Sequence, residues 1–375
     1  MDVIARVLSS FNFGGLTTLV RVPGAVKWVV AALFLLNVRS WPGVWHYRIY
    51  VLAWTIRIRF ALVKLGLLLR LHPRPRRKAL EDKWFEDLSP IGQNPLTWVK
   101  AYKSWAGPDD SDFNLHLSNS SYAKNLDMAR FDASLAINTT LFRCGGWVAL
   151  GATHFKFVRE IPMFSIYEMR TSIATWDNKW IYVVTRYVTH PKNKKKSSKS
   201  STPNGTPTPK VSLTPPSEPS GAPIASLHTP SDPSLTREPA ETGLRALANA
   251  AASQVEPDGA ILHCVAISEC CFKIGRITVP PTLVLASEGF ASPPSPSSYS
   301  HRNPPPHITH LRHYRSSQNL KSLMELMKGG WREVKEDERW WEKAFEGVVE
   351  QGRKRNLELV RGVHDGMENA RALSA

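Results

Sequence analysis

Apolar and polar positions alternate with a period of two in three segments of the middle of the chain, and one further segment before them can form a first strand. This alternation is typical of half-buried β-strands. The predicted strands cover residues 97–105, 147–159, 163–175 and 179–189. Asp177 and Asn178 supply a turn between the last two, which we therefore expect to form an antiparallel hairpin.

One helix is predicted among these strands, at residues 120–135. Ser118 and Asn119 precede it, and either side chain can accept a hydrogen bond from a free N–H group of the first turn. One helix followed by antiparallel strands indicates an α+β fold, in which the sheet wraps around a central helix.

The strand pattern breaks at residues 191–257, which are rich in Pro, Ser, Thr and Lys. Such a composition buries too little apolar surface to order itself. A last strand follows at 259–273. Because the cost of closing a loop grows slowly with its length, we expect one domain over 94–282 with a disordered insertion, not a boundary between two domains.

Two apolar segments, residues 22–38 and 49–69, predict helices in an N-terminal arm that covers residues 1–80. The uninterrupted apolar core of the first is shorter than the roughly 20 residues of a membrane span. The second carries Arg57, Arg59 and Lys64 in its middle, which favours a helix that lies on an interface. For both segments the alternative is a helix packed on the soluble domain.

The C-terminal part of the chain divides into a linker and a tail. Residues 286–316 are rich in Ser, Pro and His, and we expect a linker there. Residues 320–375 predict a helical tail, with helices at 334–345 and 349–372. The sequence leaves open whether this tail packs on the sheet or on the arm.

The positive charge of the chain is concentrated in the arm. The formal net charge is +16, and residues 1–80 hold thirteen Lys and Arg against one acid, Asp2. Basic and apolar residues together indicate an anionic membrane surface. Nucleic acid is the rival partner, but the arm is too apolar to stay solvated, so we expect none. The basic run at 70–78 favours a membrane-associated protein whose domain faces the cytosol.

The residues that other catalytic classes require are missing from the sequence. The four cysteines have neither metal-ligand spacing nor the pattern of a small disulfide scaffold. There is no G-x-S-x-G motif, which disfavours the α/β-hydrolase type of esterase, and no Gly-rich phosphate loop. We therefore expect no metal site and no cofactor.

Candidate chemistry gathers in residues 110–122, which read D-x-D-x-x-x-H-x-x-N-x-x-Y. Asp110 and Asp112 stand just before the predicted helix, whose positive dipole end points back toward them. A carboxylate that faces backbone donors suits acyl chemistry, because the acid attacks or activates water while the donors hold the oxyanion. The alternative is a capped loop before an ordinary helix.

This stretch resembles the motif D-x-D-x-x-G-H-V-N-N-x-x-Y of hotdog-fold thioesterases. The resemblance is closest to the animal and fungal branch of thioesterase-like proteins, in which the chain begins with a hydrophobic segment. Both Asp, the His, one Asn and the Tyr match. Leu115 replaces the Gly, Ser118 replaces one Asn, and Leu117 for Val is a milder change.

The resemblance implies a role for each matched residue. Asp112 takes the position of the catalytic carboxylate, as nucleophile or as general base for water. Asn119 and Ser120 would supply backbone N–H groups to the oxyanion or contact the substrate. Tyr122 would line the acyl tunnel or form a bond across a dimer.

We expect the other polar residues of the region to be structural. His116 and Asp110 would orient the loop. His154 and His263 lie on predicted strands and are expected to be packed, not catalytic.

The resemblance implies an acyl thioester hydrolase that acts on acyl-CoA or an acyl carrier protein as a homodimer, without a cofactor. Fungal proteins of this type are associated with lipid and secondary-metabolite pathways. One alternative is a non-catalytic acyl-binding or scaffolding hotdog protein at a membrane, which the altered Leu115 and Ser118 positions favour. Another is an interaction protein whose Ser/Pro/Lys-rich insertion is a docking segment controlled by phosphorylation.

Overall fold

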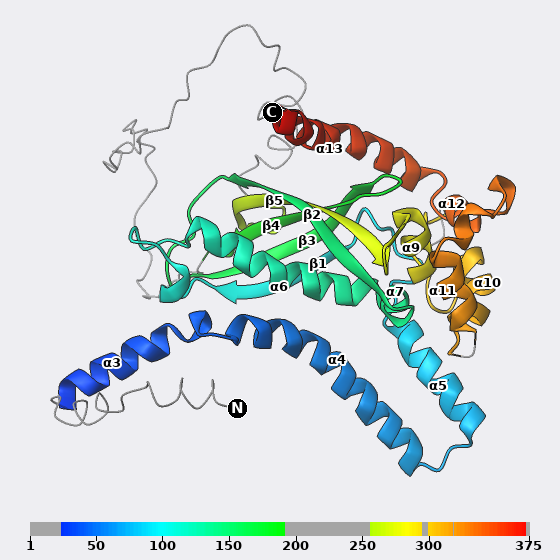
Figure 1. Cartoon of the computed structure of the whole chain (residues 1–375), viewed down its shortest axis with the longest axis horizontal. Helices are drawn as coiled ribbons and strands as arrows, with labels where there is room; N and C mark the ends of the chain where they lie inside the picture. Colours follow the sequence, from blue (N-terminus) through cyan, green and yellow to red (C-terminus); the bar gives the residue numbers. More distant parts are fainter. Residues whose placement is uncertain (1–23, 192–255, 295–298, 318, 373–375) are drawn as a thin grey trace, which may run out of the picture.

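The core of the computed structural model is one antiparallel sheet in the order β1-β3-β4-β5-β2, with β6 paired to β5 (Figure 1). The structure describes residues 24–191, 256–294, 299–317 and 319–372. The strands are β1 (Val99–Trp105), β2 (Gly146–Phe157), β3 (Ile166–Trp176), β4 (Ile181–Thr189), β5 (Ile261–Ile274) and β6 (Ile277–Val279). All the strands predicted from alternation are present, with ends that differ by a few residues.

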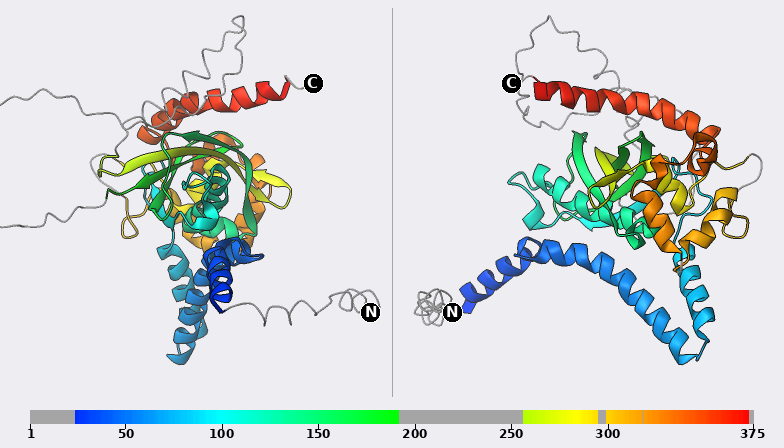
Figure 2. Two further views of the ribbon diagram at one scale, coloured as in Figure 1. Left: turned by 90° about the vertical axis from the view of Figure 1, so that its left-hand side faces the viewer. Right: turned by 45° about the vertical axis from the view of Figure 1, so that its right-hand side comes forward.

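Helix α6 (Asn119–Ile137) lies along the concave face of the sheet, and the sheet curves around it (Figure 2, left view). Its buried side chains face the strands or, as Ser121 and Asn125 do, the turn before the helix and the N-terminal arm. They are Ser121, Tyr122, Asn125, Leu126, Met128, Ala129, Ala133 and Ile137. The predicted hotdog architecture, a sheet wrapped around a central helix, is confirmed. A short helix, α7 (Thr139–Arg143), leads from α6 into β2.

The last long strand occupies a different place from the one expected. The resemblance to hotdog proteins implies that it closes the sheet, but β5 lies between β4 and β2, and β2 takes the edge. Nearly every residue of β5 is buried, since strands pair with it on both sides and helices cover parts of both faces. A strand this apolar on both faces suits the sheet interior.

The predicted insertion connects two neighbouring strands of this sheet. Thr189, at the end of β4, pairs with Ile261, at the start of β5. Both strands therefore belong to one domain, as expected. Residues 192–255 lie outside the described residues, so the predicted disorder of 191–257 stays a prediction.

The N-terminal arm is helical throughout its described part. It consists of α3 (Gly24–Leu36), the 3₁₀ turn η1 (Val38–Ser40), α4 (Val44–Leu69) and α5 (Arg74–Asp87). Helices over 22–38 and 49–69 were predicted, but α4 begins earlier than expected, and α5 forms in the basic run where no helix was expected. Figure 1 shows α3 and α4 below α6, and α4 contacts α6.

The arm presents apolar side chains to the outside. No residue of α3 is buried, and Trp28, Leu33 and Phe34 are more than half exposed. Within the described residues, no helix combines the length and the apolar character that a membrane crossing requires.

The predicted linker at 286–316 contains ordered helix. It includes the end of α9 (Pro281–Glu288) and all of α10 (Pro306–Arg315). Ile308 and Leu311 of α10 are buried in the same hydrophobic cluster as α9. The packing of these two residues against α9 gives helical structure to a segment whose Ser- and Pro-rich composition predicted a linker.

The C-terminal tail is helical, as predicted, and packs on the sheet. It contains α11 (Leu320–Met327), α12 (Trp340–Lys343), α13 (Val348–Ala372) and the 3₁₀ turns η3 (Gly330–Arg332) and η4 (Glu336–Glu338). The expected helix at 334–345 is broken into η4 and α12. Helix α13 lies across the convex face, opposite α6 (Figures 1 and 2).

Polar bonds hold α13 at an irregular point of β3. The pairing of β3 with β4 shifts register between Ile173 and Thr175. Asn356 donates to the Ala174 carbonyl at 2.8 Å, and Arg353 donates to the Trp176 carbonyl at 2.7 Å. The helix therefore satisfies backbone acceptors at this irregularity.

Candidate active site

The D-x-D motif lies on a loop that two other segments hold in place. The loop begins after the 3₁₀ turn η2 (Pro108–Asp110) and ends where α6 begins. At its base the Ser118 N–H donates to the Asp110 carbonyl at 2.9 Å. On its outer side it pairs with the connection between β2 and β3, where the Leu117 N–H donates to the Ile161 carbonyl at 2.8 Å. Backbone bonds therefore fix the loop on both sides.

Asp112 is half-buried, and its carboxylate turns back onto its own loop. Its Oδ1 accepts hydrogen bonds from the Asn114 N–H at 2.9 Å and the His116 N–H at 3.3 Å. The Asp112 N–H donates in turn to the His116 carbonyl at 2.8 Å. These bonds hold the carboxylate in one orientation. Both bonds to the side chain are accepted by Oδ1, so Oδ2 is the oxygen that could act as a base or a nucleophile.

Leu115 adopts the backbone conformation for which the family motif supplies glycine. Its φ is +61°, in the left-handed region, and its side chain is 60% exposed. The Met163 N–H donates to the Leu115 carbonyl at 2.8 Å. The loop therefore keeps the shape that glycine allows at this position, at a cost in backbone strain.

His116 shapes the loop through its backbone, not its ring. The ring points toward Glu160, with 3.3 Å between His116 Nδ1 and Glu160 Oε2. Since it is the backbone of His116 that contacts the Asp112 carboxylate, the structure places His116 as an orienting residue of the loop.

Asn119 and Ser120 are exposed at the first turn of α6, close in sequence to Asp112. Helix geometry leaves their N–H groups without partners inside the helix. The expected side-chain cap is absent at this helix start: Ser118 takes the N-cap position without a side-chain cap bond, and its hydroxyl bonds those of Ser120 and Ser121. The N–H groups of this turn are therefore the donors that the site can offer to an oxyanion.

Tyr122 is a core residue, with only 2% of its surface exposed. Its ring packs against Phe157 and Tyr187 at centroid distances of 5.1 and 4.9 Å, and the Tyr187 hydroxyl donates to the Tyr122 carbonyl at 2.8 Å. Burial raises the pKa of Tyr122 well above its usual range. The structure thus places Tyr122 behind the site, where it supports the first turns of α6.

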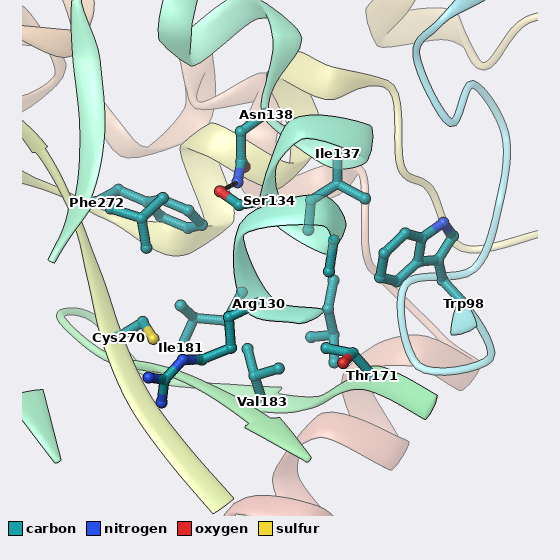
Figure 3. Close-up of a pocket in the computed structure, with 13 residues that line it drawn as sticks. Trp98, Arg130, Ser134, Ile137, Asn138, Thr171, Ile181, Val183, Cys270 and Phe272 are labelled. Carbon is teal, nitrogen blue, oxygen red and sulfur yellow. Dashed lines mark hydrogen bonds between the residues drawn. The ribbon is translucent and has the colours of Figure 1, made fainter. Parts of the chain in front are cut away.

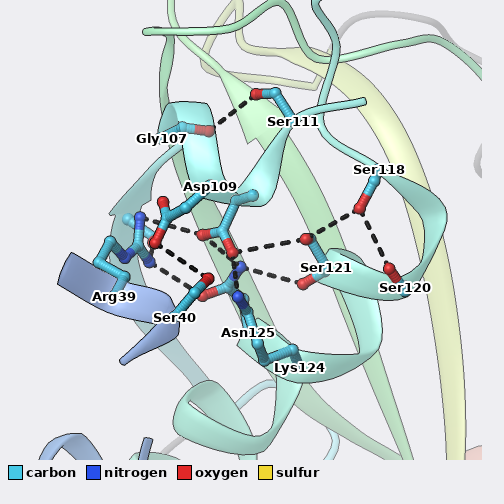
Figure 4. Close-up of polar contacts among 12 residues, drawn as sticks. Arg39, Ser40, Gly107, Asp109, Ser111, Ser118, Ser120, Ser121, Lys124 and Asn125 are labelled. Carbon is cyan, nitrogen blue, oxygen red and sulfur yellow. Dashed lines mark hydrogen bonds and ion pairs between the residues drawn. The ribbon is translucent and has the colours of Figure 1, made fainter. Parts of the chain in front are cut away.

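Asp110 is the centre of a buried polar cluster, which the sequence did not predict. Figure 4 shows four of its partners, Arg39, Ser121, Lys124 and Asn125. Its side chain is fully buried, with Arg39 Nη1 3.1 Å from Oδ2 and Lys124 Nζ in contact with Oδ1. Asn125 Nδ2 donates to Oδ2 at 3.2 Å, and the Ser121 hydroxyl donates to Oδ1 at 3.4 Å. Asp110 therefore belongs to a buried ion pair and is not an ordinary loop residue, and its role in orienting the loop stays a prediction.

The sequence held a weak signal for this cluster. Ser121, Lys124 and Asn125 are spaced three and four residues apart on α6, so one helix face presents them together. Arg39 stands just after the first apolar segment, where the sequence pattern predicts no more than a flanking charge.

A small apolar cavity lies between α6 and the sheet, toward the C-terminal end of the helix (Figure 3). Its volume is about 50 Å³, and its lining includes Trp98, Ile137, Val183 and Phe272. The cavity holds a few water-sized groups. Its helical lining begins at Arg130, about 16 Å along the helix from Asn119 at a rise of about 1.5 Å per residue. The cavity is therefore separate from the Asp112 loop.

The remaining nucleophile and ligand candidates are structural. All four cysteines are buried and free, and burial raises the pKa of Cys144 and of Cys264 to about 12 and that of Cys270 to about 11. His263 bonds Thr189 and the Glu160 carbonyl inside the fold, as expected of a packed histidine. Among the residues that the structure describes, no group of three His, Cys, Asp or Glu side chains could hold a metal ion.

The segment that carries this site matches a known family model. Residues 106–200 match the model described as the thioesterase-like superfamily. This segment belongs to that superfamily. The match begins at the end of β1 and includes the Asp112 loop, α6 and strands β2 to β4, so the motif lies inside the thioesterase-like domain.

Named thioesterases are among the relatives of this chain. The probable thioesterase YBR096W of Saccharomyces cerevisiae is 27% identical over 164 residues, which cover 43% of this chain and 64% of that protein. Thioesterase lcsJ of Purpureocillium lilacinum is 27% identical over 186 residues, which cover 43% of this chain and 58% of that protein. The chain thus spans less than two thirds of the length of these relatives.

Solved structures of thioesterases also match. The probable thioesterase YbaW from Escherichia coli aligns with a TM-score of 0.29 and 8% identity, over 51% of this chain and 94% of that one. The fold assignment of the thioesterase-like domain rests on its own strand order and central helix.

Proposed function

We propose that this protein hydrolyses acyl thioesters of coenzyme A or of an acyl carrier protein at the Asp112 loop. One observation carries the proposal. Asp112 occupies the second acid of the D-x-D motif in a segment of the thioesterase-like superfamily, and two backbone bonds to Oδ1 orient its carboxylate just before α6.

The site supports two routes of thioester hydrolysis. As a general base, Asp112 takes a proton from water while the water oxygen bonds to the carbonyl carbon. The C–S bond then breaks, and the leaving thiolate takes up the proton. As a nucleophile, Oδ2 bonds to the carbonyl carbon and expels the thiolate, and water then cleaves the mixed anhydride.

Both routes place negative charge on the thioester oxygen. The N–H groups of Asn119 and Ser120 are the donors that would stabilise it, and the dipole of α6 adds to their effect. The roles proposed for these residues are therefore backbone roles, which side-chain substitution leaves largely intact.

A second candidate function is acyl binding without hydrolysis. Two departures from the family motif favour it. Leu115 stands where the motif has Gly, and Ser118, which replaces an Asn, bonds neighbouring hydroxyls.

We further propose that the arm binds a membrane surface and that the domain faces the cytosol as a homodimer. The exposed apolar residues of α3 and the basic residues of 1–80 support membrane binding. The dimer rests on the likeness to hotdog thioesterases. Full-length protein should float with vesicles, whereas a chain that begins at residue 80 should not, and light scattering on the purified protein tests the dimer.

The substrate follows from the same likeness. Named thioesterases of fungi are among the relatives, and the resemblance to fungal proteins of this type favours an acyl group of lipid or secondary metabolism. Full-length protein in detergent micelles should release free thiol from one or more acyl-CoA esters in a series of increasing chain length. Saturable binding of acyl-CoA without any release would replace the hydrolase by the binding protein, and the absence of both would exclude the two candidates together.

A further inference from the structure

Arg39, in the arm, contacts three elements that flank the Asp112 loop. Its Nη1 donates to the Trp105 carbonyl at the end of β1, at 2.7 Å, and lies 3.1 Å from Asp110 Oδ2 in η2. Its Nη2 donates to Asn125 Oδ1 of α6, at 3.0 Å. The guanidinium also lies over the Trp105 ring, 5.6 Å from its centroid. One side chain therefore joins a strand end, the turn before the loop and the helix after it.

Asp110, the acid that pairs with Arg39, fixes the backbone at the start of the Asp112 loop. The Asp110 carbonyl accepts the bond from Ser118 that closes the loop, and its carboxylate is bonded to Ser121 and Asn125 of α6. Asp112 is only two residues away along the chain. A displacement of Asp110 therefore moves the backbone that carries Asp112.

The buried carboxylate of Asp110 is stabilised by two cations, Arg39 and Lys124. Asp110 is fully buried, whereas Arg39 is 11% exposed and Lys124 is 30% exposed. A buried charge that loses a partner is strongly unfavourable, so the surrounding backbone has to open toward water. Arg39 is the more buried of the two cations, and its planar fork bonds several acceptors at fixed angles, which a lysine cannot do.

Two further contacts bring the arm to the same place. The Ser40 hydroxyl donates to Asp109 Oδ2 at 3.2 Å, and Arg48 of α4 donates to Asn125 Oδ1 at 3.1 Å. The turn η1 is thus bonded to Asp109 and Asp110 of η2, and α4 adds a bond to Asn125 of α6, while no residue of α3 is buried.

We propose that Arg39 is a positioning residue for hydrolysis, through which the docked arm holds the Asp112 loop in its reactive shape. The proposal rests on the proposed thioesterase function for its kinetic consequence only. The arm then has two roles, since the apolar faces of its helices remain available for a membrane while its central turn completes the site.

The experiment compares four full-length variants in detergent micelles. Arg39→Ala removes the guanidinium group, and Arg39→Lys keeps the positive charge without the planar guanidinium. Lys124→Ala removes the other cation that contacts Asp110. Arg57→Ala removes an exposed arginine of α4 and is the control. Two quantities are measured: hydrogen exchange of the amides at 111–118, and kcat and KM for a short, water-soluble acyl-CoA.

Arg39→Ala should raise exchange at 111–118 by about tenfold or more, because the loop opens without its anchor. It should lower kcat by about tenfold to a hundredfold, with KM changed by less than about twofold, since a small misplacement of a catalytic group affects turnover. Arg39→Lys should show smaller changes in exchange and in kcat than Arg39→Ala. Arg57→Ala should match wild type in both quantities.

Three results would overturn the proposal. The first is unchanged exchange at 111–118 in Arg39→Ala. The second is that Lys124→Ala raises exchange at 111–118 and lowers kcat as much as Arg39→Ala does. The effect would then come from the loss of one positive charge beside Asp110 and not from the arm. The third is a parallel rise of exchange over the whole sheet, which would indicate general destabilisation. If wild type hydrolyses no thioester, the proposed function fails, and the exchange data alone decide the role of Arg39. If Arg39→Ala does not fold, Arg39→Lys against Arg57→Ala makes the same comparison.

Discussion

The Met163 N–H donates to the Leu115 carbonyl at 2.8 Å, and this bond helps to hold Leu115 at a φ of +61° in the loop that carries Asp112. Phe164, next to Met163, is also in the left-handed region, with a φ of +64°. Two large exposed side chains therefore stand in conformations that favour glycine, on the two segments that border the site.

Replacing Leu115 by glycine should stabilise the protein. The left-handed conformation costs a non-glycine residue about 1–2 kcal/mol, and the greater freedom of glycine in the unfolded chain cancels part of the gain. We expect the free energy of unfolding to rise by up to about 1 kcal/mol, measured by urea denaturation. Leu115→Ala is the control, because it removes the same exposed side chain and keeps the strain; equal midpoints for the two variants would mean that φ carries no cost here.

Asp112→Asn should abolish most of the activity and leave the fold intact. The amide keeps the shape and the acceptor oxygen that bonds Asn114 and His116, but it neither accepts a proton nor attacks. Turnover should fall by about two to four orders of magnitude, measured as free thiol released from acyl-CoA. Glu358→Gln, an exposed acid on α13, is the matched control. Unchanged hydrolysis in Asp112→Asn would remove Asp112 as the catalyst.

Asp110→Asn should behave in the opposite way, with stability as the main loss. It removes the buried charge that pairs with Arg39 and Lys124, and breaking a buried pair costs about 3–5 kcal/mol. Urea denaturation should show this loss in Asp110→Asn and no comparable loss in Asp112→Asn. A stable, fully folded Asp110→Asn protein would contradict the role assigned to the buried cluster.

Protonation of His307 should destabilise the protein in mild acid. Burial lowers the pKa of His307 to about 4 in the folded protein, and the nearby Arg315 charge acts in the same direction. Since the unfolded chain binds this proton near pH 6.5, the unfolded state holds more protons between pH 6.5 and 4, and stability falls as pH falls through that window. The contribution present above pH 6.5 is about 3 kcal/mol.

Unfolding free energies at pH 7 and pH 4 measure this effect. His307→Gln should show a smaller difference between the two pH values than wild type, because it has no proton to gain. His313→Gln, an exposed histidine of the same helix, should keep the wild-type difference. If both variants keep it, another group controls the acid response.

Removing the apolar stripe of α4 should weaken membrane binding. Trp54, Ile58, Leu62 and Leu65 are exposed and recur every three or four residues, so they share one helix face. The double variant Ile58→Ser/Leu62→Ser should bind anionic vesicles at least about tenfold less, since burial of each side chain contributes about 1.5–3 kcal/mol. Flotation with vesicles measures it, and Met367→Ser, an exposed apolar residue of α13, is the control. If the double variant binds vesicles as strongly as Met367→Ser does, the apolar residues of α4 do not contribute to membrane binding.

The sequence by itself determined the local elements of the thioesterase-like domain. Alternation located β2 to β4, apolar segments before and after them predicted β1 and β5, and the D-x-D motif placed Asp112 directly before α6, because strand period, helix start and motif spacing are all properties of neighbouring residues. The same local patterns predicted helices in the arm and α13 in the tail.

Only the tertiary structure decided what depends on contacts between distant segments. The place of β5 inside the sheet, the order of α10 within a Ser- and Pro-rich segment, and the core position of Tyr122 all follow from burial against elements far away in the chain. The pairing of Arg39 with Asp110 joins residues 71 positions apart, as counted from their numbers. No local period marks such a pair, since the attraction between the two charges becomes strong only where the fold removes them from water, and that burial exists only once the fold has formed.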